Sequence, residues 1–308
     1  MGVLNLHRVA IIGFGEAGQA YAQGWNELGV SASAFSIAAF DTKTASSDVS
    51  VRDAKLADYQ TYKVDGCKEI SQSLKGASVI ISLVTADQAY EAACNTAKHL
   101  EKGALFFDGN SCAPSTKLQS AKAIESAGGR YVDMAIVAPV HPTLHQTPVL
   151  LSGPHAKEAM QEVGYLNLAA KLIDGPVGRA SAIKMTRSIM MKGLEALMLE
   201  CVLAGRKAGV EDTVLESLEV TYPGFGWKDR AAYMFERVMT HGKRRAAEMR
   251  EVAITVADLE LNNGMAAATV DWHQQIGDLE LDASTLEGQP YGAYADLVLE
   301  NLGKNKDE

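Results

Sequence analysis

A glycine-rich segment near the start of the chain has the residue types and spacing of a phosphate-binding turn. The apolar run at 9–12 leads into Gly13, Gly15 and Gly18, which form the pattern G-x-G-x-x-G, and helix-forming residues follow. In this pattern the first glycine permits a tight turn, the second lets the backbone approach a pyrophosphate, and the third lets the helix pack on the strand. The segment predicts a dinucleotide site with cofactor contacts from Gly13, Phe14, Gly15, Glu16, Ala17 and Gly18.

An acidic residue stands where the next expected strand ends. The run at 35–40 stops at Asp41, roughly 20 residues after the last glycine of the turn. A carboxylate there accepts hydrogen bonds from the adenosine ribose hydroxyls and repels a 2′-phosphate, so it favours NAD over NADP. Lys43 could weaken or reverse that preference, which leaves NADP open. We expect Thr42 and Lys43 to be further cofactor contacts.

Polar residues follow two more apolar runs. The run at 79–84 leads to Thr85, and the run at 104–108 is followed by Asn110 and Ser111. Because ligands of open α/β sheets bind beyond the carboxyl ends of the strands, both ends should face the same crevice. Asn110 and Ser111 could bond a nicotinamide carboxamide or a substrate oxygen, or they could instead only cap the following helix. The expected cofactor contacts here are Leu83, Val84, Thr85 and Asn110.

The second half of the chain supplies a candidate proton acceptor. A long helical stretch that is apolar on most sides predicts a helix buried between domains or in a dimer interface. Lys184, Arg187, Ser188 and Met191 lie at helical spacing on one of its faces. Burial and the nearby arginine should lower the pKa of Lys184, which suits proton exchange with a substrate hydroxyl. The alternative is that Lys184 extends to the surface.

The helices and strands that must position these residues differ between the first and the second part of the chain. Up to about residue 175, short apolar runs alternate with helical stretches, which predicts a parallel sheet with helices on both faces. After Gly175 and Pro176 the residues favour helix. We predict an α/β chain with a Rossmann-type, doubly wound parallel sheet at residues 1–177 and an all-helical substrate and dimerisation domain at 178–308. The expected strands are 9–13, 35–40, 79–84, 104–108, 131–135 and 149–152.

Length and charge narrow the class of protein further. At roughly 100–200 residues per domain, 308 residues predict two domains. The chain has 29 Lys and Arg against 38 Asp and Glu, and a net charge of −9 argues against nucleic acid or an anionic membrane as partner. No apolar run reaches the roughly 18 residues of a membrane span and the start lacks a signal peptide, so we expect a cytoplasmic protein. The four cysteines lack the spacing of a zinc site, and no metal is expected.

Taken together, these motifs resemble the 3-hydroxyacid dehydrogenases, the superfamily of 6-phosphogluconate dehydrogenase and 3-hydroxyisobutyrate dehydrogenase. The resemblance covers nearly the whole chain, and the stretch 240–249 is similar to a less characterised subgroup. It implies a nucleotide-binding domain joined to a helical domain that commonly dimerises, and it implies that Lys184 is the catalytic acid/base. We expect Asn110 and Ser188 to be the other catalytic residues. The residues that carry it are the glycine turn, Asp108-Gly109-Asn110-Ser111 with Pro114, and Gly175-x-x-Gly178 with Lys184.

The sequence departs from this family where relatives bind substrate. Relatives carry Ser-Gly-Gly after the strand that here contains Asp133, and they often carry Asn where this chain has Ser188. These departures argue against 3-hydroxyisobutyrate and 6-phosphogluconate as substrates. The cluster 243–245 could supply an anion contact or form a solvated helix face, and His145 accompanies His141 beside the crevice loop. The expected substrate contacts are Ser111, Val137, Ala138, Pro139, His141, Arg187, Lys192, His241, Arg244 and Arg245.

The sequence therefore predicts an NAD(P)-dependent oxidoreductase that transfers hydride between a hydroxy acid or related polar alcohol and the nicotinamide. NAD is the preferred cofactor, Lys184 is the general acid/base, and a homodimer is expected. Two other functions stay open. An imine or opine-type reductase shares the architecture, although such relatives usually replace the lysine. A non-catalytic NAD-binding sensor would keep the glycine turn and tolerate loss of Lys184.

Overall fold

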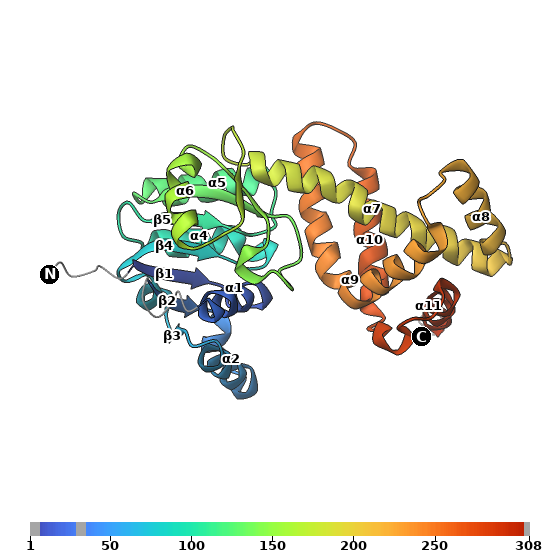
Figure 1. Cartoon of the computed structure of the whole chain (residues 1–308), viewed down its shortest axis with the longest axis horizontal. Coiled ribbons are helices and arrows are strands. Elements are labelled where there is room, and N and C mark those ends of the chain that lie inside the picture. Colours follow the sequence, from blue (N-terminus) through green and yellow to red (C-terminus); the bar gives the residue numbers. More distant parts are fainter. Residues whose placement is uncertain (1–6, 29–34, 305–308) are drawn as a thin grey trace. The chain divides into compact units, whose positions relative to one another are not determined.

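Strands and helices alternate through the first part of the chain (Figure 1). The computed structural model describes residues 7–28 and 35–304, and the chain divides into two compact units, residues 1–184 and 185–308. The strands of the first unit are β1 (His7–Ile12), β2 (Phe35–Phe40), β3 (Asp65–Cys67), β4 (Ala77–Ser82), β5 (Leu105–Asp108), β6 (Arg130–Ile136), β7 (Val149–Ser152) and β8 (Ala170–Leu172).

These eight strands form one sheet in the order β3-β2-β1-β4-β5-β6-β7-β8. Helices connect them: α1 (Glu16–Glu27), α2 (Val49–Thr61), α3 (Ile70–Leu74), α4 (Ala89–Ala97), α5 (Pro114–Ser126) and α6 (Ala156–Tyr165), with short 3-10 helices η2 (Thr42–Ala45), η3 (Ala86–Gln88) and η4 (Leu144–Gln146).

The sheet is covered on both faces, which confirms the predicted doubly wound fold. Side chains of β1 alternate between two cores: Val9 and Ile11 pack in one with Trp25 of α1, and Ala10 and Ile12 pack in the other. A parallel strand buried on both sides needs such a continuous apolar run. All six expected strands are present.

The sheet differs from the prediction in two ways. β7 runs antiparallel to β6, whereas every other pair is parallel. The β6–β7 connection contains only the short helix η4, and a parallel return would need a longer crossover, usually an α-helix. The edge strands β3 and β8 were not predicted, because each has three residues and lacks an apolar run.

After β8 the described residues contain only helices as regular elements. They are α7 (Arg179–Ala208), α8 (Glu211–Thr221), α9 (Trp227–Asp258), α10 (Gly264–Asp278), η5 (Ala283–Leu286) and α11 (Tyr291–Lys304). The long helix α7 begins in the first unit and continues into the second. In the part of the chain that the structure describes, no helix has the length and apolarity to cross a membrane.

Two glycines let α9 and α10 approach closely. A Cβ added to Gly242 of α9 would lie 2.5 Å from the His273 carbonyl oxygen, and one added to Gly277 of α10 would lie 2.5 Å from the Lys243 nitrogen. Both neighbours are backbone atoms, which cannot rotate away. The spacing of these two helices therefore depends on the absence of side chains here.

We predict that Gly242→Ala destabilises the protein by about 1–3 kcal/mol or more, because overpacking forces the backbone apart. The matched control is Gly193→Ala in α7, where the nearest atom to an added Cβ is 3.7 Å away. That change should stabilise by about 0.5–1 kcal/mol, since alanine favours helix. Urea unfolding measures both, and equal effects of the two substitutions would contradict the close crossing.

Candidate active site

The glycine-rich turn joins β1 to α1 and has the shape that its sequence predicts. Gly13 has φ +89°, and a Cβ there would lie 2.5 Å from the Leu83 carbonyl oxygen. A Cβ on Gly18 would lie 2.6 Å from the Gly13 oxygen, whereas one on Gly15 would meet no atom within 4 Å. The turn is therefore closed at Gly13 and Gly18 and open at Gly15, where a pyrophosphate can approach the N-terminus of α1.

Asp41 lies at the end of β2 and is bonded to this turn. Its Oδ2 accepts a hydrogen bond from the Phe14 amide at 2.8 Å, and its Oδ1 accepts one from the Lys43 amide at 2.9 Å. A carboxylate has further lone pairs, so ribose hydroxyls can still bind. The Phe14 ring is fully buried and packs on Tyr59, with ring centroids 5.2 Å apart, so only the backbone of Phe14 is placed for a cofactor.

The other expected cofactor residues surround the same turn. Glu16 is exposed and Ala17 half-buried in the first turn of α1, and Thr42 and Lys43 are exposed at the start of η2. Lys55 was not predicted: it is buried, and its Nζ donates to the Phe14 carbonyl oxygen at 2.6 Å. An open glycine, a helix N-terminus and a strand-end carboxylate together fit a dinucleotide.

Asn110 connects the loops that follow β4 and β5. Its Oδ1 accepts the Val84 amide at 2.7 Å, and its Nδ2 donates to Ser82 Oγ at 3.0 Å. Leu83 is buried, and its amide donates to the Ile12 oxygen at the end of β1 at 2.7 Å. Asn110 therefore fixes the loop next to the cofactor turn, whereas Thr85, at the start of η3, is exposed.

Lys184 reaches Ser111, one residue beyond Asn110. Its Nζ donates to Ser111 Oγ at 2.5 Å, and both side chains belong to the first unit. Lys184 is half-buried. The amine and the hydroxyl therefore lie together at the carboxyl edge of the strands that carry the glycine turn.

A fully buried ionic cluster lies beneath this pair. Lys117 of α5 donates to Asp108 Oδ1 at 2.8 Å and lies 3.7 Å from Asp133 Oδ1, and all three side chains are inaccessible to solvent. Tyr131 donates to the other oxygen of Asp108 at 2.7 Å. Burial by itself lowers the pKa of Lys117, but the carboxylates, Asp108 foremost, outweigh it and hold that pKa above its ordinary value. The lysine therefore stays charged.

Asp133 also holds the beginning of α7. Its Oδ2 accepts the amides of Gly178 at 3.0 Å and Ser181 at 3.1 Å, and its Oδ1 accepts the Ser181 hydroxyl at 2.6 Å. Ser152 Oγ accepts the Ala180 amide at 2.9 Å. A carboxylate at a helix N-terminus satisfies open N–H groups and complements the helix dipole. Lys184 follows Ser181 by about one turn, so this contact sets its position.

Lys117 and the capping role of Asp133 were missed by sequence reasoning. Lys117 stands in a helix with a mixed polar pattern, and nothing in its neighbours marks it as buried. Asp108 and Asp133 partly indicate the buried cluster in the sequence, because each is a charged residue within an apolar strand.

The loop after β6 holds several expected substrate contacts. Val137 is half-buried, and Ala138, Pro139 and His141 are exposed. Because β6 is parallel to β5, this loop leaves the sheet at the same carboxyl edge. His145 is different: it is buried against Gly24 of α1, and burial lowers its pKa, so it is a neutral packing residue.

The remaining expected residues belong to the second unit. Arg187 is exposed and Ser188 is buried on α7. Lys192, also buried, lies 2.9 Å from Glu248 Oε2 and donates to Ser188 Oγ at 3.3 Å. Lys192 is therefore neutralised within its own unit.

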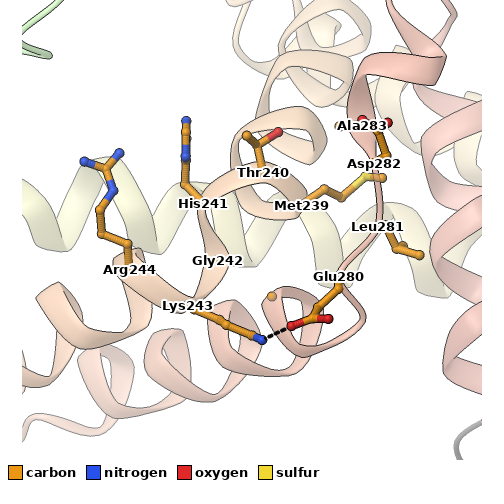
Figure 2. A pocket seen from close by; sticks show the side chains of 11 residues that line it. Met239, Thr240, His241, Gly242, Lys243, Arg244, Glu280, Leu281, Asp282 and Ala283 are labelled. Atoms are coloured by element: carbon orange, nitrogen blue, oxygen red, sulfur yellow. Dashed lines mark hydrogen bonds and ion pairs between the residues drawn. The ribbon is translucent and has the colours of Figure 1, made fainter. Parts of the chain in front are cut away.

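The basic cluster of α9 does not form one patch. Lys243 pairs with Glu280, whereas His241 and Arg244 project from α9 in another direction (Figure 2). Arg245 is buried, and its Nε donates to Glu195 Oε2 at 2.9 Å. A cavity of about 510 Å³ is lined by His241, Lys243 and Arg244 among others. Burial first, and then the neighbouring arginines, lower the pKa of His241.

The class of protein follows from the turn and the sheet: it is a dinucleotide-binding protein of Rossmann type. A family model described as the NAD binding domain of 6-phosphogluconate dehydrogenase matches residues 8–196, and the chain belongs to this family. A second model, described as a domain of unknown function (DUF1932), matches residues 206–276.

Three relatives span most of the chain. A conserved hypothetical protein from Sinorhizobium meliloti 1021 is 31% identical, with 96% of this chain and 97% of that one covered and a TM-score of 0.76. A conserved protein of unknown function, whose solved structure is described as similar to 3-hydroxyacid dehydrogenases, is 28% identical over 88% and 97% of the two chains, with a TM-score of 0.66. An uncharacterized 28.5 kDa protein of Methanothermus fervidus is 26% identical over 269 residues, 87% of this chain and 98% of its own.

These findings confirm the predicted superfamily, the NAD-binding domain and the helical C-terminal domain. The protein is a 3-hydroxyacid dehydrogenase-like oxidoreductase that binds a nicotinamide cofactor. Among the described residues no group of His, Cys, Asp or Glu is arranged to hold a metal ion.

We predict that Lys117→Met destabilises the protein by about 3–5 kcal/mol, because it leaves two buried carboxylates without their cation. Lys122→Met, an exposed lysine of the same helix, should change stability by less than about 0.5 kcal/mol. The double variant Lys117→Met with Asp108→Asn should recover part of the loss, since one charge is removed. Urea unfolding of the three proteins is the measurement, and a single-variant effect as small as that of Lys122→Met would refute the cluster's role.

Proposed function

We propose that the protein is a dehydrogenase that oxidises the hydroxyl group of a hydroxy acid or a related polar alcohol, with Lys184 as general acid/base. One observation supports this most strongly: Lys184 Nζ lies 2.5 Å from Ser111 Oγ, at the edge of the sheet that carries the cofactor turn. A side-chain amine and a hydroxyl in contact form a natural site for a substrate hydroxyl. The half-buried position of Lys184 also keeps it within reach of a ligand.

The chemistry divides between cofactor and protein. The bound nicotinamide supplies the acceptor for the hydride that leaves the carbinol carbon. Lys184, in its neutral form, takes the hydroxyl proton as the carbonyl forms, and Ser111 orients the substrate oxygen by sharing a hydrogen bond with the same amine. Asn110 acts by holding the loop that carries Ser111, through Val84 and Ser82. In the reverse direction Lys184 returns the proton.

We propose that NAD is preferred. Asp41 places a carboxylate at the end of β2, bonded to the turn through the Phe14 amide. A 2′-phosphate at this position would meet a negative charge. The exposed side chain of Lys43, two residues after Asp41, is a positive group that favours NADP.

We propose that residues 1–177 form the cofactor domain and 178–308 the substrate and dimerisation domain. Proposed substrate contacts are Ser111, Val137, Ala138, Pro139 and His141 in the first, and Arg187, Ser188, His241 and Arg244 in the second. The ammonium of Lys192 is paired with Glu248 and the guanidinium of Arg245 with Glu195, so we assign both residues a structural role.

We predict that Lys184→Ala lowers turnover by about 10²–10⁴-fold, because the proton acceptor is lost. Its dissociation constant for NAD should stay within about twofold of the wild type, since the cofactor turn is untouched. NADH formation with a panel of hydroxy acids, sugar acids and aromatic diols measures turnover. Lys157→Ala, an exposed lysine of α6, is the matched control. Full activity of Lys184→Ala would rule out its role, and absence of turnover on the whole panel would favour an imine reductase or an NAD sensor.

We predict that Asp41→Asn improves NADP binding at least tenfold relative to NAD. The amide keeps an acceptor for the Phe14 N–H but removes the charge that repels a 2′-phosphate. Asp48→Asn is the control, because it makes the same charge change at the N-cap of α2, where Asn caps as well as Asp. Calorimetric titration with both cofactors gives the ratio, and an unchanged ratio would show that Asp41 does not select the cofactor.

A further inference from the structure

The peptide group between Phe14 and Gly15 lies within the glycine-rich turn, and two side chains hold its carbonyl end. Lys55 Nζ donates to the Phe14 carbonyl oxygen at 2.6 Å, and Gln19 Nε2 donates to the same oxygen at 3.3 Å. Lys55 belongs to α2 and Gln19 to α1. Side chains from two helices therefore fix the position of this one backbone oxygen.

Asp58 keeps both donors in place. Its Oδ2 accepts a hydrogen bond from Lys55 Nζ at 2.6 Å and one from Gln19 Nε2 at 3.0 Å. Lys55 is only 6% exposed, and burying a charge costs free energy unless its partners compensate. The packing of α2 on the turn does not need this charge, because the Phe14 ring already contacts Tyr59 of the same helix. The buried lysine therefore indicates a role for the peptide group that it holds.

The direction of this peptide group follows from its geometry. The peptide bond is trans, and a trans peptide points its C=O and its N–H in opposite directions. Because Lys55 holds the Phe14 oxygen, the Gly15 N–H points away from the lysine. A charged donor on the carbonyl also polarises the peptide group, which makes its N–H a stronger donor. Gly15 is the position where the turn is open, since an added Cβ would meet no atom within 4 Å.

We propose that Lys55 is a positioning residue for the cofactor. It acts through the Phe14 carbonyl group, and it directs and polarises the Gly15 N–H that donates to the cofactor pyrophosphate. Gln19 supplies a second, uncharged donor in the same role. This inference rests on a nicotinamide cofactor bound at the glycine-rich turn, and it does not depend on the catalytic role of Lys184.

Two ligands that differ only in the pyrophosphate test this role in the full chain. The probes are ADP and adenosine, with dissociation constants measured by calorimetry and by ligand-observed NMR. Lys55→Met should weaken ADP binding about tenfold, because the peptide loses a charge-assisted hydrogen bond. Adenosine binding should change by less than about twofold, since the adenosine contacts are not altered. Gln19→Met should weaken ADP binding about threefold, because its donor is neutral.

Two further variants serve as controls. Lys55→Arg keeps a charged donor and should restore ADP binding to within about twofold of the wild type. Lys122→Met removes the same charge from an exposed site of α5 and should bind both ligands as the wild type does. This variant separates the proposed role from a general effect of net charge on an anionic ligand.

Three results would overturn the proposal. They are unchanged ADP binding in Lys55→Met, equal weakening of ADP and adenosine, and a loss that Lys55→Arg does not restore. A wild type that does not bind ADP would overturn it as well. Failure of the proposed oxidation reaction is a separate result, because no turnover is measured. If circular dichroism shows that Lys55→Met does not fold, Gln19→Met and Lys55→Arg decide.

Discussion

Two carboxylates share one lysine inside the first unit, and the geometry of the candidate site depends on that arrangement. The side chains of Asp108, Lys117 and Asp133 are inaccessible to solvent. Buried charges are tolerated only when they are paired and hydrogen-bonded. The lysine balances one negative charge. The amides at the start of α7 and the Ser181 hydroxyl supply positive ends for the other. Moving α7 away from the sheet would leave Asp133 unsatisfied, so the start of the helix, and with it Lys184, is held in place.

The same edge of the sheet is preorganised by bonds between neighbouring loops. The loop after β1 is bonded to β2 through Asp41, and the loop after β4 is bonded to that after β5 through Asn110. Asp41 and Asn110 can each still accept a further hydrogen bond, because a carboxylate or an amide oxygen can accept more than one. The site can thus be ordered before a ligand arrives and still contact it, which reduces the entropy cost of binding.

Much of the structure of the first unit could be predicted from the sequence. The features that could not be predicted have physical reasons. The glycine turn, Asp41 and the six longer strands depend on local conformation and burial, which residue type and spacing report directly. The strands β3 and β8 are short and sit at the sheet edges, so they need few apolar residues. Lys117 is a charged residue whose burial depends on partners distant in sequence, and no local pattern shows this. The antiparallel direction of β7 follows from the short β6–β7 connection, which contains only η4 and no crossover helix. The missing helix leaves no motif in the sequence that would indicate this direction.

In the helical unit, consecutive charges behave independently because successive helical residues point about 100° apart. Lys243, Arg244 and Arg245 therefore take different surroundings, and only Arg245 enters the core, where it meets Glu195 of α7. Such a buried pair adds little net stability, but it penalises any rotation of α7 that would separate the charges. With Glu195 turned inward, the positions on the far side of the helix, Met190 and Leu197, must face outward. The polar contact inside the unit thus fixes which side of α7 is buried in the core of the unit and which side is exposed.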